Sequence, residues 1–460
     1  MGAIFLHHPW RTVMGLGAAA TLIMVTSSAG PGTAPTNGPA TAAWQTTAKP
    51  TQEPGPQSSQ DPGPAPSQQP GPQSSPGSGQ EPAAGGGGQV RDNDRIVRDS
   101  MSRHNLAALI VRITKDGQLI YEGAAGESMA GVPATPQMHF RNGSMAFTYM
   151  GTILLMLADV GKLHLHDKLS ESFPELPHAD DVTLKMLANM TAGYADYVYQ
   201  PELLDGTTRD PFREWTTAEL IESGTTKPMM FEPGTNWGYS HTDYVILARV
   251  IEKASGMSMD ELMRTHIIEP LKLRQTQSLA TPQVPEPVLH TFTSERREAL
   301  DIPAGTPFYE EATFWNPSWA TAGGAVQVSS IADLATSIAA VGEGTLLSSA
   351  SHSAQVSPEL AGFGKEVQGC GACHRNTEAF SYGLGVILRG PWITQNKLFA
   401  GGGGAVGYLP SEKLAIAVAT TYAPGAFDAQ GNYVAADGAI VEELAEELAP
   451  EHPVPELPGQ

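Results

Sequence analysis

Basic residues are scarce in this chain of 460 residues. It contains 27 lysines and arginines against 48 aspartates and glutamates, so its formal net charge at pH 7 is −21. A charge of this sign and size opposes phosphate backbones and anionic lipid headgroups. We therefore expect neither a nucleic-acid partner nor strong binding to a membrane surface. The charge fits a soluble acidic protein and does not identify a substrate.

Cysteine is nearly absent as well, and the only two cysteines are Cys370 and Cys373, with His374 directly after them. Two cysteines and one histidine leave a tetrahedral zinc site incomplete, so no metal is predicted. The Cys-x-x-Cys-His spacing is that of covalent haem attachment, and it equally permits a local disulfide or a dithiol. A local disulfide is the ordinary state of such a pair in an exported protein. We favour it and expect no cofactor, with haem as the alternative.

The N-terminal region lacks an apolar run long enough to cross a bilayer. The run from Val13 to Val25 is shorter than the roughly 20 residues that a membrane helix requires. Arg11 precedes it and small residues follow at 27–29, which is typical of a secretory signal. We predict a cleaved signal peptide at residues 1–29 and an exported, secreted or cell-envelope protein, with an uncleaved anchor as the alternative.

Large apolar residues are missing from the next segment. Residues 30–89 consist mainly of Pro, Gly, Ser, Gln and Thr, with Trp44 the only large apolar residue. Such a composition cannot bury enough apolar surface to offset the entropy lost on ordering, so a disordered linker is predicted. The composition of a folded domain occupies residues 90–455, and residues 456–460 form a short tail.

The folded region alternates helical and strand patterns. Helices are predicted where apolar residues recur three and four positions apart, and strands where short runs are rich in Val, Ile and Leu. The predicted helices are 91–103, the segment from the serine at 144 to Val160, 243–255, 331–340 and 440–448, and the predicted strands are 106–114, 118–124 and 413–421. This order predicts an α+β fold, an antiparallel sheet with helices on its faces and an inserted helical lobe.

The segment 140–148, which reads Phe-Arg-Asn-Gly-Ser-Met-Ala-Phe-Thr, resembles the nucleophile motif of the serine β-lactamase and penicillin-binding-protein family, in its class C, DD-peptidase and esterase branch. Further segments resemble family landmarks in the same order. They are 190–193, 231–234, 239–241, 322–324, 382–385 and 407–408. The resemblance covers almost all of residues 90–455 and implies an α/β domain plus an all-helical domain, with an active site between them.

The resemblance assigns roles to particular residues. Ser144 stands at the position of the nucleophile, and Tyr239 at that of the tyrosine that serves as base or proton shuttle. The family's lysine, three residues after the serine, is replaced by Phe147. A tyrosine has a pKa of about 10 and needs a nearby cation to become basic at neutral pH. Alternatively, Ser144 is simply a helix N-cap and Tyr239 a packed aromatic residue.

Two further positions depart from the family pattern. His241 stands where an asparagine is usual, and we hypothesise that its imidazole replaces the missing lysine as base for Ser144. The glycine run from Gly401 replaces the cationic third motif, which favours a neutral ester or amide over a penicillin or a peptide C-terminus. Backbone amides of Ser144 with Gly403 or Gly404 are the predicted oxyanion hole.

Two classes of function follow from this pattern. The first is an exported serine hydrolase that acts through Ser144, with atypical or weakened catalysis, on a small-molecule ester or amide or on a cell-wall-derived substrate. The second is a catalytically degenerate protein of the same fold that binds a cell-wall fragment, an acyl ester or a protein. Retention of Ser144 and Tyr239 favours the hydrolase, whereas the loss of both cationic residues favours the binding protein.

Overall fold

The computed structural model describes residues 86–279, 281–303 and 305–455. The predicted signal peptide (1–29), nearly all of the predicted linker (30–89) and the tail (456–460) lie outside the described residues. Among the described residues, none of the helices combines the length and the apolar character needed to cross a membrane.

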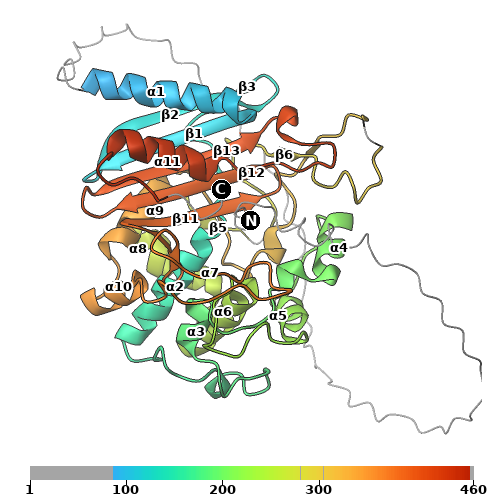
Figure 1. Cartoon of the computed structure of the whole chain (residues 1–460), viewed down its shortest axis with the longest axis vertical. Helices are drawn as coiled ribbons and strands as arrows, with labels where there is room; N and C mark the ends of the chain where they lie inside the picture. The colour runs from blue at the N-terminus through green and yellow to red at the C-terminus, as the bar shows by residue number, and fades with distance from the viewer. Residues whose placement is uncertain (1–85, 280, 304, 456–460) are drawn as a thin grey trace, which may run out of the picture. The chain divides into compact units, whose positions relative to one another are not determined.

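Strands and helices alternate along the chain in the order that the sequence predicts (Figure 1). The helices are α1 (Gly86–Arg103), α2 (Met145–Asp159), α3 (Leu184–Ala188), α4 (Pro201–Arg209), α5 (Thr217–Thr225), α6 (His241–Ser255), α7 (Met259–Met263), α8 (Glu269–Leu271), α9 (Ile331–Glu343), α10 (Ser349–Gln355) and α11 (Asp437–Leu448). The strands are β1 (Leu106–Lys115), β2 (Gln118–Met129), β3 (Val132–Pro133), β4 (Phe140–Arg141), β5 (Gln277–Ser278), β6 (Phe292–Thr293), β7 (Glu310–Glu311), β8 (Gln327–Ser329), β9 (Ser381–Tyr382), β10 (Ile387–Arg389), β11 (Trp392–Phe399), β12 (Gly402–Leu409) and β13 (Leu414–Tyr422).

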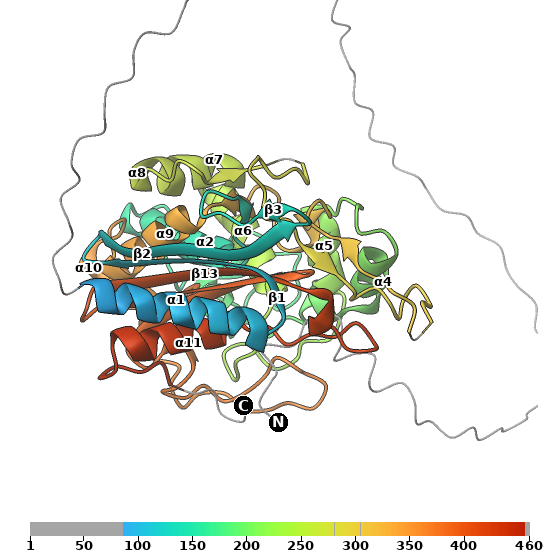
Figure 2. The ribbon, with the colours of Figure 1, turned by 90° about the horizontal axis from the view of Figure 1, so that it is seen from above.

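An antiparallel sheet of eight strands forms the centre, in the order β3-β2-β1-β13-β12-β11-β10-β9. Helices α1 and α11 pack side by side on one face of this sheet, and α9 packs on the other with α2 beyond it (Figure 2). The helical lobe of α3 to α6 follows α2 in the chain and packs against it through α6. The predicted α+β fold, a sheet covered by helices with a helical lobe, is confirmed.

Alternation along the strands divides the apolar side chains between two cores. In β13, Ile416 and Val418 point into the core beneath α1 and α11, whereas Ala415, Ala417 and Ala419 point into the larger core on the side of α9. Because successive side chains of a strand point to opposite faces, the continuous apolar run serves both cores at once. The small alanines leave room for α9 to pack close to the sheet.

Helix boundaries agree with the end signals in the sequence. Helix α2 is buried on almost every side, as its nearly continuous apolar sequence requires, and it ends before Gly161, whose φ is +70°. Helix α6 ends at Gly256, whose φ is +77°. Helix α1 starts at Gly86, four residues inside the predicted linker, because each residue added to an existing helix gains a backbone hydrogen bond.

Candidate active site

Ser144 lies at the end of a tight turn between strand β4 and helix α2. Gly143 has a φ of +56°, and a Cβ at this position would lie 2.5 Å from the Cβ of Lys397 on the neighbouring strand β11. Glycine is therefore required here both by backbone conformation and by lack of space. The Ser144 side chain forms no capping hydrogen bond to α2. Its Oγ accepts a hydrogen bond from the Tyr239 hydroxyl at 3.3 Å instead.

Tyr239 lies just before helix α6, in a segment that is held at both ends. Gly238 forms a β-bridge with Cys373, and the Ser240 hydroxyl accepts a hydrogen bond at 3.4 Å from the amide of Asp243, so Ser240 is the N-cap of α6. Burial raises the pKa of Tyr239 well above 10, the charge of Asp196 adds to the rise, and the hydrogen bond with Ser144 opposes it. At neutral pH Tyr239 is therefore a neutral phenol that can donate a proton.

Phe147 takes the place of the family's lysine and builds an apolar wall. Its side chain is 2% exposed and stacks on Tyr244, with 4.2 Å between ring centroids. The rings of Tyr239 and His241 lie 6.0 Å and 5.5 Å from it. This wall covers part of the Tyr239 side chain, which is itself partly buried. Burial in apolar surroundings disfavours the charged phenolate and is the main cause of the raised pKa of Tyr239.

His241 is the first residue of α6 and pairs with a carboxylate. Its Nδ1 lies 2.9 Å from Oδ2 of Asp196, and its ring meets the ring of Tyr239 edge-on at 5.3 Å. The structure thus joins His241 to Tyr239 by ring contact and brings both near Asp196, but it records no contact between His241 and Ser144. Asp243, one turn into α6, is fully buried, and burial together with the charge of Asp196 raises its pKa well above 3.8.

The strand beside the Ser144 turn is β11, and not the strand of the glycine run, which was predicted to supply the oxyanion hole. Gly403 and Gly404 lie on β12, which is paired on both edges, with β11 and with β13. Strand β11 lies between them and Gly143, and the amide nitrogen of Leu398 is 3.4 Å from the position of a Cβ on Gly143. The expectation that an amide of Gly403 or Gly404 lies beside Ser144 is corrected accordingly. Gly402 to Gly404 form strand β12 and not a loop, because their backbone pairs with β11 on one side and with β13 on the other.

The two cysteines are joined by a disulfide, Cys370–Cys373, which packs against the backbone that leads into Tyr239. A Cβ on Gly238 would lie 2.9 Å from Sγ of Cys373. His374 packs edge-on against Trp237 at 4.5 Å, and burial lowers its pKa to about 4. Both sulfur atoms are used in the disulfide, which leaves none for thioether bonds to haem. Among the described residues, no cluster of His, Cys, Asp and Glu side chains could hold a metal ion.

Asp196 and Lys397 were missed by the sequence reasoning. Asp196 follows the segment 190–193 closely, and its place three residues beyond a family landmark was a usable signal. Lys397 lies in a strand whose alternation is hidden by polar residues, so no local pattern marked it as buried. Only the approach of β11 to Gly143 identifies Lys397 as a neighbour of the site.

Comparison with known proteins identifies the family. The family model described as "Beta-lactamase" matches residues 93–440, which is most of the chain. This match agrees with the fold and with the position of Ser144 at the start of α2. The chain belongs to the beta-lactamase family, the group of serine hydrolases that the nucleophile motif resembles.

Individual relatives are more distant. The chain is 33% identical over 155 residues to Penicillin-binding protein 4* of Bacillus subtilis (strain 168), covering 32% of each protein. It is 28% identical over 185 residues to Penicillin-binding protein 4 of Amycolatopsis lactamdurans, covering 39% of this chain and 46% of that protein. The matches thus span less than half the length of these curated relatives.

Among solved structures, the D-amino acid amidase from Ochrobactrum anthropi SV3, in complex with D-phenylalanine, has the same fold. Its TM-score is 0.63 at 20% identity, over 78% of this chain and 99% of that one. At this identity the likeness establishes the fold alone.

Proposed function

We propose that this protein is an exported serine hydrolase that forms an acyl-enzyme at Ser144 with a modified set of proton-transfer groups. The observation that carries the proposal is the hydrogen bond of 3.3 Å between the Tyr239 hydroxyl and Ser144 Oγ, in a site where the Ser144 side chain makes no capping hydrogen bond to α2. Such a bond is longer than the usual O–H···O distance of about 2.7 Å. Hydrogen bonds of this kind often tighten when a substrate is bound.

A neutral tyrosine suits a site without a lysine. As Ser144 attacks a carbonyl carbon, the phenol takes the serine proton and gives its own proton to the leaving group, so it carries no net charge before or after the step. The raised pKa of Tyr239 keeps the phenol protonated for this exchange. The ring contact with His241, itself paired with Asp196, orients the phenol.

The oxyanion of the tetrahedral intermediate requires donors on the other side of the carbonyl. The amides of Ser144 and Leu398 are the pair that we propose, because β11 approaches the Gly143 turn at Leu398. Without a lysine the proton transfers are less assisted, and positioned acid–base help contributes about 10²- to 10⁴-fold in such enzymes. We therefore expect a slow hydrolase.

The substrate class that we propose is a small amide or ester, including cell-wall-derived molecules. The fold shared with a D-amino acid amidase and the partial similarity to penicillin-binding proteins support this class. Export is supported by the signal-like residues 1–29 of the sequence.

The test is covalent labelling of the purified protein with an alkyl fluorophosphonate, followed by mass spectrometry of the digested protein. We expect one adduct, on the peptide that contains Ser144, and none in Ser144→Ala. Ser337, a buried serine on α9, offers a matched control, and Ser337→Ala should be labelled at the wild-type rate. Absence of any adduct, with the protein folded, would instead support the degenerate binding protein.

A further inference from the structure

A long loop contacts the segment that leads into Tyr239. Residues 356–380, which we call the 356–380 loop, join α10 to β9 without forming a helix or a strand. Loops of more than roughly 12 to 15 residues without secondary structure are uncommon in compact domains, and most of those in a folded domain have a function. The 356–380 loop contacts residues 236–238, which directly precede Tyr239.

Side chains of residues 236–238 join this segment to the loop. The side-chain amide of Asn236 forms two hydrogen bonds with the backbone of Lys365, accepting from its N–H at 2.7 Å and donating to its oxygen at 3.1 Å. Trp237 is fully buried, and its ring packs edge-on against the ring of His374 with 4.5 Å between centroids. The segment before Tyr239 is therefore held by the 356–380 loop at consecutive residues.

The disulfide of the loop packs against Gly238. Gly238 and Cys373 form an isolated antiparallel β-bridge. A Cβ on Gly238 would lie 2.9 Å from Sγ of Cys373 and 3.6 Å from Sγ of Cys370, so both sulfur atoms lie close to the Gly238 backbone. Tyr239 is the next residue, and its hydroxyl donates to Ser144 Oγ. The position of the phenol therefore depends on a backbone that packs against the disulfide.

The two sulfur atoms differ in their access to solvent. Cys373 is 2% exposed, whereas Cys370 is only partly buried. In thiol–disulfide exchange a thiolate attacks a sulfur atom that it can reach, and the other sulfur atom leaves. Cys370 is therefore the point of attack for an external thiol, and Cys373 is the leaving group.

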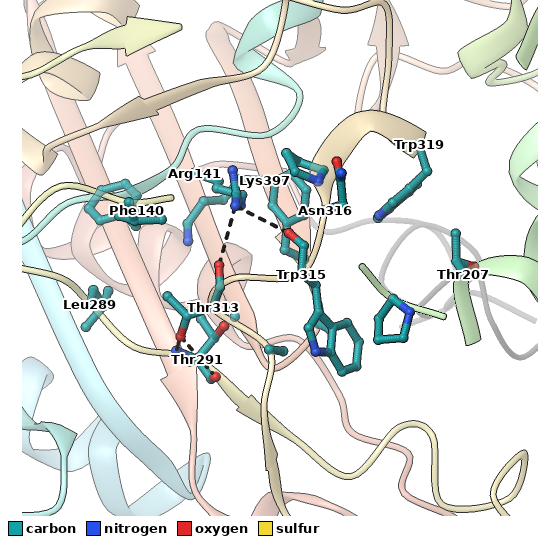
Figure 3. A pocket seen from close by; sticks show the side chains of 17 residues that line it. Phe140, Arg141, Thr207, Leu289, Thr291, Thr313, Trp315, Asn316, Trp319 and Lys397 are labelled. Atoms are coloured by element: carbon teal, nitrogen blue, oxygen red, sulfur yellow. Dashed lines mark hydrogen bonds between the residues drawn. The ribbon is translucent and has the colours of Figure 1, made fainter. Parts of the chain in front are cut away.

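The strand that leads into Ser144 is held by other contacts. Arg141 of β4 donates hydrogen bonds to the backbone oxygens of Pro282 at 2.5 Å and Trp315 at 3.3 Å. Arg141 lines a cavity to which no residue of the 356–380 loop contributes (Figure 3). The loop thus reaches the site on the side of Tyr239 and not on the side of β4.

We propose that the Cys370–Cys373 disulfide is a site of thiol–disulfide exchange with a dithiol, and that its oxidised state positions Tyr239 against Ser144. Cys370 and Cys373 are positioning residues in this proposal, because they act on the reaction through Tyr239. The inference rests on the proposed function, since the position of the phenol affects the reaction only if the phenol transfers the serine proton. It adds a redox dependence to that reaction.

The exchange takes place in two steps. A thiolate of the dithiol attacks Sγ of Cys370 and forms a mixed disulfide, and Cys373 leaves and takes up a proton. The second sulfur atom of the dithiol then attacks the first one, which closes the reagent's own disulfide and releases Cys370 as a protonated thiol. Two electrons and two protons thus pass from the dithiol to the protein.

Reduction changes the packing on Gly238. It adds two hydrogen atoms to sulfur atoms that already lie where Gly238 has no room for a Cβ. It also removes the cross-link of the loop, whose residues regain conformational freedom. We therefore expect the bridge between Gly238 and Cys373 to open and the phenol of Tyr239 to move. A misplacement of about 1 Å can lower a reaction rate by about 10²-fold.

The test compares the oxidised and the reduced protein in their rate of labelling by an alkyl fluorophosphonate. The full chain is reduced with dithiothreitol under native conditions, and the reductant is removed without access to air. Mass spectrometry of a sample treated with iodoacetamide confirms that both thiols are free. We expect reduction to slow labelling of Ser144 at least about tenfold and reoxidation to restore the original rate. Labelling of the reduced protein at the oxidised rate would overturn the proposal.

Two variants distinguish positioning of the phenol from a general loss of structure. In Tyr239→Phe reduction should not slow labelling further, because two changes that remove the same interaction are not additive. A tenfold effect of reduction in this variant would refute the positioning role. The double variant Cys370→Ser, Cys373→Ser should be labelled as slowly as the reduced wild type. It should not respond to dithiothreitol, which controls for effects of the reductant elsewhere.

Hydrogen exchange provides a measurement that requires no reactive serine. The amide of Gly238 donates to the backbone oxygen of Met190 at 3.2 Å, and reduction should speed exchange of the peptide containing Gly238 at least about tenfold. The amide of His139, which donates to the backbone oxygen of Pro287 at 2.7 Å, is the control and should exchange at the same rate in both states.

The two measurements separate this proposal from the proposed function. Faster exchange at Gly238 in a protein that is never labelled would remove the acyl-enzyme mechanism and keep the effect of the disulfide on this segment. Labelling at Ser144 at one rate in both redox states, with unchanged exchange at Gly238, would keep the hydrolase and remove the role of the disulfide.

Discussion

Tyr239→Phe removes a single hydroxyl from the site and tests the proposed proton shuttle directly. The substitution keeps the ring, so the contacts with Phe147 at 6.0 Å and His241 at 5.3 Å are retained. The substitution removes the hydrogen bond of 3.3 Å between the Tyr239 and Ser144 hydroxyls, a long bond between neutral groups. Such a bond contributes about 0.5 to 1.5 kcal/mol to the free energy of unfolding. The folded state should therefore persist with a loss of about 1 kcal/mol.

The effect on reactivity should be much larger than the effect on stability. If the phenol transfers the serine proton, its removal lowers the rate of fluorophosphonate labelling by about 10²- to 10⁴-fold. The assay is the second-order rate constant of adduct formation by mass spectrometry, with urea unfolding of the same protein. Divergence of the two effects separates a catalytic phenol from a structural one.

Tyr309→Phe is the matched control. The Tyr309 hydroxyl donates to the backbone oxygen of Tyr422, and Tyr309 directly precedes β7, a strand that pairs with β6. A similar loss of stability is expected with labelling at the wild-type rate. If Tyr239→Phe were labelled as fast as wild type, the proton shuttle would be refuted, whatever the change in stability.

Three further predictions concern the surroundings of the site. Replacing Cys370 and Cys373 by serine should lower the free energy of unfolding by about 2 kcal/mol, from the loop-closure entropy of a four-residue loop, and a reductant should do the same to wild type in urea titrations. Burial raises the pKa of Asp437 to about 6, although the charge of Lys397 opposes the rise. The carboxyl group of Asp437 therefore binds its proton more tightly in the folded state than in the unfolded state. The free energy of unfolding should consequently fall as pH rises from about 4 to about 6. The decrease in the free energy of unfolding should be at most about 3 kcal/mol, and it should be absent from the pH profile of chemical unfolding of Asp437→Asn. If the decrease remained in Asp437→Asn, another group would be responsible for it. His241→Ala should slow labelling about tenfold or more by loosening the phenol, and an unchanged rate would remove His241 from the mechanism.

Local patterns were sufficient for most secondary structure in the folded domain. The strand predicted at 413–421 is β13 within one residue, and the helix predicted at 243–255 is α6 with an earlier start at His241. These predictions held because a strand with a continuous apolar centre and a helix between a serine N-cap and a glycine are both decided by nearby residues. The glycine run was harder, since glycine occurs in loops and in strands alike, and only pairing with β11 and β13 makes it a strand.

Sequence alone determined the family, the nucleophile position of Ser144 and the absence of the usual lysine at Phe147, because each is a matter of residue identity and spacing along one segment. The tertiary structure decided which groups meet there. It placed Tyr239 at Ser144, paired His241 with Asp196, and brought the buried ammonium of Lys397 beside the Gly143 turn. These contacts join segments far apart in the chain, and their distances depend on how the sheet and helices pack, which no local pattern records.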